Sequence, residues 1–203
     1  HVAGAARGVP DALLVTLGTG IGAGVIADGE LVRGAHGFAG EAGHMVVDPN
    51  GPPCPCGREG CWERFASGSG LGMLGREAAV AYRFRRGVEL AGEPDEVRGE
   101  HVTRAAAEGD ADALAIMQRF GEWVALGIGN LLAVLDSSLV VIGGGLVEAG
   151  DLLLDPIRAA LPDQVMAPQE RTDVRIVAAE LGERAGAIGA ALLGDREASE
   201  RSG

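Results

Sequence analysis

Aromatic residues are scarce in this chain of 203 residues and make up only 3% of it. Apolar residues nevertheless reach 47% and glycine occurs 34 times, which predicts a globular core with close backbone packing. The sequence has no unbroken run of about 18 apolar residues, the length that a membrane-spanning helix needs. It also opens without the charged, apolar and small-residue regions of a signal peptide. We therefore expect a cytoplasmic protein that makes no use of a membrane.

Positively charged residues are also few in this chain. The chain has 17 Lys and Arg residues against 29 Asp and Glu residues, a formal net charge of -12. Phosphate backbones and anionic membranes attract clustered positive charge. We therefore expect no nucleic-acid partner for this segment.

Short apolar runs and turn residues predict adjacent antiparallel strands near the start of the chain. One run covers residues 12–18 and a second covers residues 23–27, with a glycine-rich turn between them. Asp28-Gly29 suits a tight hairpin turn into residues 30–33. Residues 34–60 contain too much Gly and Pro for extended regular structure.

The rest of the chain predicts helices, and then strands that alternate with helices, so the fold class is α/β. Helical periodicity covers residues 70–84 and 101–135, with a break at residues 108–110 where Asp110 can cap the next helix. Residues 87–100 are polar and predict an exposed connection. The later predicted elements are strands at 139–142 and 174–179, helices at 151–161 and 185–193, and a frayed tail at 195–203.

The three cysteines of the chain lie within eight residues, as Cys54, Cys56 and Cys61, and His44 precedes them by ten positions. Zinc takes four tetrahedral ligands from thiolate and imidazole groups, so this spacing predicts a structural zinc loop over residues 44–61. The alternatives are unrelated thiols or a disulfide. His44 is the least constrained ligand, because a lone His after a glycine is more often an ordinary polar residue.

Two glycine turns are weak signals for phosphate binding. We call residues Gly18–Gly22 the first glycine turn and Gly143–Gly145 the second. Neither is a Walker A loop, because no Lys-Ser/Thr pair follows, and the first leads into a strand, which excludes a dinucleotide-binding fingerprint. Their backbone N–H groups can still line phosphates.

Two carboxylates flank the predicted zinc loop. Glu41 precedes His44 by three positions, and Glu63 follows Cys61 by two. Carboxylates fixed in this way accept hydrogen bonds from sugar hydroxyls, but two ordinary solvated glutamates would give the same pattern.

Three segments, LGTGIGAG, RGAHGFAGEAGHM and CPCGREGCWE, resemble in order and spacing the ROK family of sugar kinases and sugar-responsive repressors. Within the family they most resemble ATP-dependent glucokinases of the actinobacterial type. The resemblance continues through SLVVIGGG and implies a two-lobed actin-like ATPase fold of the ribonuclease H-like type. Residues 1–203 would then form the larger C-terminal lobe, opening with a helix end at HVAGAARG. The N-terminal lobe, with its D-x-G-G-T phosphate loop and catalytic Asp, would be absent from the chain.

The resemblance also implies roles for individual residues. The implied roles are sugar-hydroxyl binding for Glu41, His44 and Glu63, zinc binding for His44, Cys54, Cys56 and Cys61, and contact with phosphates or nucleotide for Thr19, Gly20, Gly144 and Gly145. His44 would thus bind the metal and face the sugar at once. The implied cofactors are structural Zn2+ and ATP with Mg2+, the implied partner is glucose or a related hexose, and the implied assembly is a homo-oligomer.

Together these features predict a glucokinase of carbohydrate metabolism and glycolysis that transfers phosphate from ATP to the 6-hydroxyl of glucose. This chain would orient the sugar without supplying the catalytic base, so alone it would be inactive. One alternative is the sugar-sensing half of a ROK repressor. Others are a kinase for N-acetylmannosamine, fructose or allose, a polyphosphate-dependent kinase, and a zinc-stabilised interaction module without a small-molecule ligand.

Overall fold

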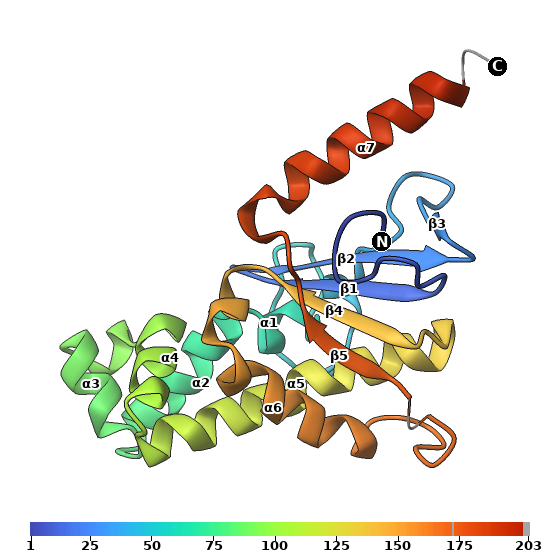
Figure 1. The fold of residues 1–203 in the computed structure, drawn as a ribbon. Coiled ribbons are helices and arrows are strands. Elements are labelled where there is room, and N and C mark those ends of the chain that lie inside the picture. Colours follow the sequence, from blue (N-terminus) through green and yellow to red (C-terminus); the bar gives the residue numbers. More distant parts are fainter. Residues whose placement is uncertain (172, 201–203) are drawn as a thin grey trace.

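A mixed five-stranded sheet in the order β3-β2-β1-β4-β5 organises the protein (Figure 1). The structure is a computed structural model that describes residues 1–171 and 173–200. Strand β1 pairs antiparallel with β2 and parallel with β4, which in turn pairs parallel with β5. The strands are β1 (Ala12–Leu17), β2 (Ile21–Ala27), β3 (Glu30–Leu31), β4 (Leu139–Gly143) and β5 (Arg175–Ala178).

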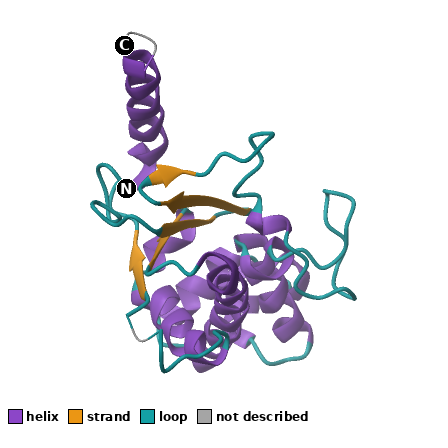
Figure 2. Cartoon of the chain, turned by 90° about the vertical axis from the view of Figure 1, so that its right-hand side faces the viewer, coloured by secondary structure: helices purple, strands orange, loops and turns teal. Residues whose placement is uncertain are grey.

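Most of the helices cover one face of this sheet (Figures 1 and 2). They are α1 (Glu63–Ala66), α2 (Gly68–Val80), α3 (Arg85–Ala91), α4 (Gly99–Ala107), α5 (Ala111–Leu135), α6 (Asp151–Ala160) and α7 (Ala185–Glu200). Short 3-10 turns are η1 (Ala42–His44), η2 (Pro94–Glu96), η3 (Gly145–Ala149), η4 (Leu161–Asp163) and η5 (Gly182–Arg184). Among the described residues, no helix combines the length and the apolar character that crossing a membrane requires.

The main core lies between the sheet and the helices. Leu13, Val15 and Leu17 of β1 point into it, because alternate residues of a strand face the same side of a sheet. Strand β4 is buried at every position, since it lies between β1 and β5 and is covered on both faces. Its Leu139 and Val141 belong to a smaller cluster on the opposite face.

The secondary structure confirms most of the sequence predictions. It corrects two of them, the connection over residues 87–100 and the helix end over residues 1–8. The strands, the hairpin and the helix break before Asp110 are confirmed. The exposed connection predicted over 87–100 is wrong, because this segment contains the end of α3, a 3-10 turn and the start of α4. Its Val97 is fully buried and packs near Gly75 of α2.

The sequence also predicted the structure at each end of the chain, a helix end over residues 1–8 and a frayed tail over residues 195–203. The helix end expected over residues 1–8 is instead a set of turns, with Arg7 N–H donating to the Gly4 carbonyl over 2.9 Å. Helix α7 extends to Glu200 and so includes part of the segment predicted to fray. Residues 201–203 of that segment lie outside the described residues.

Asp110 caps α5, and its removal is expected to cost about 1 kcal/mol of unfolding free energy. Its side chain accepts a hydrogen bond from the backbone N–H of Ala113 over 2.8 Å. Denaturant unfolding of Asp110→Ala measures this loss. The matched control is Asp112→Ala, an exposed acidic residue of the same first turn that makes no cap bond. Equal destabilisation by the two variants would contradict the capping role.

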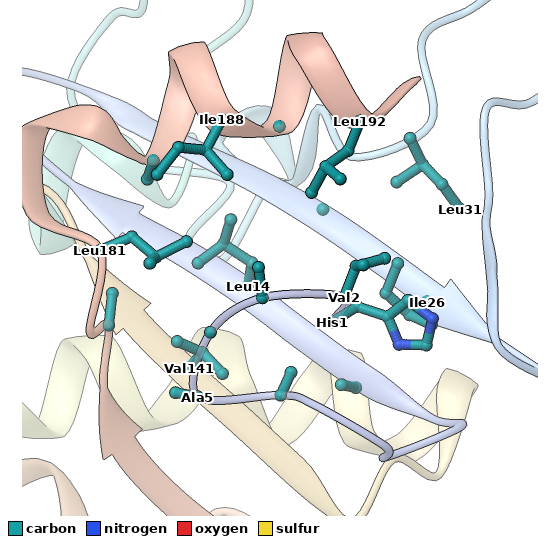
Figure 3. A pocket seen from close by; sticks show the side chains of 18 of the residues that line it. His1, Val2, Ala5, Leu14, Ile26, Leu31, Val141, Leu181, Ile188 and Leu192 are labelled. Atoms are coloured by element: carbon teal, nitrogen blue, oxygen red, sulfur yellow. The ribbon is translucent and has the colours of Figure 1, made fainter. Parts of the chain in front are cut away.

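The face of the sheet opposite the main core carries an apolar cavity of about 320 Å³. Figure 3 shows Leu14 and Ile26 of the strands on one side of this cavity and Ile188 and Leu192 of α7 on the other. The first residues of the chain complete its wall (Figure 3). Few hydrogen-bonding side chains line it, so it suits neither a sugar nor a nucleotide.

Candidate metal and substrate site

The segment that carries the cysteines folds back on itself beside the end of the sheet. Isolated bridges join Val46 to Cys61 and Pro53 to Glu59, and the Val47 N–H donates to the Gly60 carbonyl over 2.9 Å. Gly60 has a φ of 64°, and a Cβ there would overlap the carbonyl oxygen of Asp48. Only glycine fits this position, where the loop returns toward α1.

Trp62 anchors the end of this loop to α5. Its ring is fully buried, and its Nε1–H donates to the backbone carbonyl of Trp123 over 2.8 Å. A Cβ at Gly127 of α5 would lie 2.0 Å from the Trp62 ring. The absence of a side chain at Gly127 therefore leaves the space for the Trp62 ring, and the packed ring attaches the loop to the core.

The four predicted zinc ligands converge. The ligand atoms of His44, Cys54, Cys56 and Cys61 all lie within 4.8 Å of one another. Cys54 Sγ is 3.6 Å from His44 Nδ1, and the Sγ atoms of Cys56 and Cys61 are 3.5 Å apart. In a tetrahedral zinc centre, bonds of about 2.3 Å to sulfur and about 2.0 Å to nitrogen separate such ligands by roughly 3.5 to 3.8 Å. The donor set and its spacing therefore fit zinc, and all three cysteines are free thiols rather than a disulfide.

The three sulfur atoms differ in their environments. Burial, above all, raises the pKa of Cys61 to about 12 and also raises the pKa of Cys54. A hydrogen bond from the backbone N–H of Arg58 is the main reason that the pKa of the exposed Cys56 is lowered to about 6. If all three sulfurs were thiolates in so small a volume, they would repel one another. A cation bound between them would remove this repulsion, as it does in a Cys3His zinc centre.

His44 lies between the cysteines and the two carboxylates. Its Nδ1 atom is directed to Cys54 and lies 3.7 Å from Glu63 Oε1, whereas its Nε2 atom lies 4.0 Å from Glu41 Oε2. The Glu63 side chain is 19% exposed and the Glu41 side chain 61% exposed. One ring nitrogen can thus bind a metal while the other faces the open side of the site.

The first glycine turn lies against the start of α2, beside Glu63. The Gly68 N–H donates to the Gly18 carbonyl over 2.7 Å, and the Ser69 hydroxyl donates to the Thr19 carbonyl over 2.9 Å. Sequence reasoning missed Ser69, although the Ser-Gly-Ser-Gly start of a helix, where Ser67 is the N-cap, is a detectable signal.

The second glycine turn lies at the same edge of the sheet as the first. Gly144 has a φ of 84°, and a Cβ there would lie 2.4 Å from the carbonyl oxygen of Leu17 at the end of β1. Nothing lies within 4 Å of the corresponding position at Gly145. The carboxyl ends of the parallel strands β1 and β4 thus bring the two turns together, at the edge of a sheet where α/β proteins bind ligands.

A mixed sheet with adjoining glycine turns, flanked by a Cys-rich loop and two carboxylates, has the fold of the actin-like ATPase class. The model of the ROK family matches residues 1–197, and the chain belongs to this family. The chain is 38% identical to the glucokinase of Streptomyces coelicolor over 193 residues, which cover 94% of the chain but 61% of that protein.

The fold of this chain also matches a solved structure of a ROK family member. The crystal structure of a ROK family glucokinase from Streptomyces griseus, in complex with glucose and AMPPNP, matches with a TM-score of 0.86 and 37% identity. The match covers 93% of this chain and 62% of that one. The xylose repressor of Bacillus subtilis is 30% identical over 93% of this chain and 45% of the repressor. The chain therefore spans about three-fifths of its glucokinase relatives and less than half of the repressor.

Proposed function

We propose that the whole protein is an ATP-dependent hexose kinase that phosphorylates glucose at the 6-hydroxyl. The observation that carries this proposal is the position of His44, with Nδ1 at the cysteines and Nε2 toward Glu41. The glucokinase of Streptomyces coelicolor and the glucose-bound structure from Streptomyces griseus support glucose as the substrate.

In this proposal the carboxylates orient the sugar. Glu41 and Glu63 accept hydrogen bonds from sugar hydroxyls, and His44 holds its position between them. Zinc bound to His44, Cys54, Cys56 and Cys61 is structural, because four protein ligands leave no open position for substrate. Bound there, the metal would fix the ring of His44 and the shape of the loop.

The two glycine turns form the nucleotide side of the site. Thr19 and Gly20 lie at the end of β1, and Gly144 and Gly145 follow β4 directly. Their backbone N–H groups are available to phosphate oxygens, and Mg2+ bound with ATP would supply charge neutralisation for the transfer.

The catalytic Asp belongs, in this proposal, to an N-terminal lobe outside residues 1–203. We therefore expect this chain alone to form no glucose 6-phosphate from glucose and ATP, because nothing in its sugar site is assigned as the base that deprotonates the 6-hydroxyl. A coupled assay measures product, with the full-length protein as the positive control. Zinc content and circular dichroism establish that the shorter chain is folded. Turnover by residues 1–203 would contradict this division of roles.

A panel of hexoses tested on the full-length protein, with ATP or polyphosphate as the donor, tests the function itself. We expect the highest kcat/KM with glucose and ATP. A preference for N-acetylmannosamine, fructose or allose would keep the kinase and change its substrate. Glucose binding without turnover, together with sugar-dependent DNA binding, would favour a repressor. No thermal shift with any sugar would favour a zinc-stabilised interaction module.

A further inference from the structure

We propose that Gly20 is a positioning residue for the sugar-binding carboxylate of Glu63. The absence of a side chain at Gly20 leaves the space that this carboxylate occupies. The resemblance to sugar kinases assigns Gly20 to the phosphates, whereas this contact assigns it to the sugar. The inference rests on the proposed function, in which Glu63 binds sugar hydroxyls.

The contact between Gly20 and Glu63 is short. A Cβ at Gly20 would lie 2.7 Å from Glu63 Oε2 and 3.8 Å from its Cδ. Real Cβ atoms essentially never approach another heavy atom within 3.0 Å. The φ of Gly20 lies outside the left-handed region, so its backbone is open to any residue. Glycine is therefore needed here to keep the neighbouring carboxylate where it is, and not by the backbone conformation.

The backbone of the first glycine turn is held on several sides and cannot easily yield. The Gly18 N–H donates to the Gly20 carbonyl over 3.0 Å, which closes the turn. Ser69 and the Gly68 N–H hold it from α2. Ile21, the residue after Gly20, is also held. A Cβ at Gly43 would lie 2.5 Å from the Ile21 carbonyl oxygen, so η1 packs closely against the start of β2.

The carboxylate, in contrast, is the far end of a flexible side chain. A methyl group at Gly20 is therefore accommodated by rotation of Glu63 rather than by movement of the turn. Such a rotation costs the fold little, but it moves the Oε2 atom away from its position beside the turn. Glu63 Oε1 also accepts a hydrogen bond from Cys54 Sγ over 3.4 Å, but zinc binding would remove this thiol proton, so the loss falls on sugar binding.

The test compares Gly20→Ala with Gly186→Ala in the full-length protein. Glucose affinity is measured by calorimetry without nucleotide. We expect Gly20→Ala to weaken glucose binding roughly tenfold, as expected when a hydrogen bond to a charged group is lost. Gly186→Ala is the control, because Gly186 lies in α7 outside the proposed site and a Cβ there would have nothing within 4 Å, and it should change the glucose Kd less than about twofold. Zinc content and melting temperature should stay unchanged in both.

A second comparison shows whether the effect passes through Glu63. In a Glu63→Asp background the shorter carboxylate no longer reaches the new methyl group, so adding Gly20→Ala should weaken binding less than about twofold. A full tenfold effect in that background would overturn the inference.

Other outcomes separate the inference from the proposed function. If the unaltered protein binds glucose and Gly20→Ala binds it equally well, the inference fails and the proposed function stands. If Gly20→Ala loses zinc or melts far earlier, the turn itself has moved, and the inference is again overturned. If the unaltered protein binds no hexose, the proposed function fails, and the inference fails with it.

Discussion

Removing the metal from the full-length protein with a chelator is expected to abolish glucose binding and to lower the melting temperature by roughly 10 °C. A ligand present at about 1,000 times its Kd stabilises the native state by about 4 kcal/mol, and each kcal/mol shifts the melting temperature of a domain of this size by about 2 to 4 °C. The described part of the loop is joined by isolated bridges and turn hydrogen bonds rather than by a helix or a paired strand, so we expect the metal to hold His44 beside the carboxylates.

Differential scanning calorimetry and metal analysis by mass spectrometry check this result. Added Zn2+ should restore both the melting temperature and glucose binding. Cys61→Ser is the matched control, since a variant that already lacks a ligand should respond little to the chelator. Unchanged melting and unchanged glucose affinity in protein shown to be metal-free would contradict a structural zinc site.

Replacement of His44 by alanine is expected to cost zinc and glucose together. The Nδ1 atom of the ring faces Cys54 over 3.6 Å, and the Nε2 atom faces Glu41 over 4.0 Å, so one substitution removes a group from both sets of contacts. Loss of a group that links a metal to its surroundings lowers affinity by about 10- to 100-fold, and we expect a change of this size in glucose binding.

Metal analysis and calorimetry on His44→Ala provide the measurements. His36→Ala is the control, because His36 lies in the same glycine-rich segment, is exposed and is not part of the ligand cluster. Full zinc content with unchanged glucose affinity in His44→Ala would refute the dual role.

The sequence predicted the elements whose signals are local. The hairpin after β2 follows from Asp28-Gly29, the start of α5 follows from the Asp110 cap, and the metal cluster follows from the spacing of its cysteines. In each case the residues that decide the structure are neighbours along the chain, so no knowledge of distant contacts is needed.

Distant contacts explain what the sequence did not predict. Val97 lies in a polar stretch, and its burial depends on a space beside Gly75 of another helix. The bond between Ser69 and Thr19 joins residues 50 positions apart, and it forms only because α2 begins beside the end of β1. The closeness of the two glycine turns likewise depends on the parallel pairing of β1 with β4.

Because β1 pairs with β4, the two sides of the proposed site are completed at different times during synthesis of the chain. Every proposed metal and sugar ligand lies between Glu41 and Glu63, on a stretch that closes through its own bridges beside the β1–β2 hairpin and is attached to α5 by Trp62. The nucleotide side needs β4, which pairs with β1 only after residue 139 has left the ribosome. Chains fold from the N-terminus as they are made, so the growing polypeptide carries a complete set of zinc ligands well before its second glycine turn exists. The residues proposed to bind metal and sugar are therefore all made before those of the second glycine turn, so zinc offered during translation should be taken up before the nucleotide side exists.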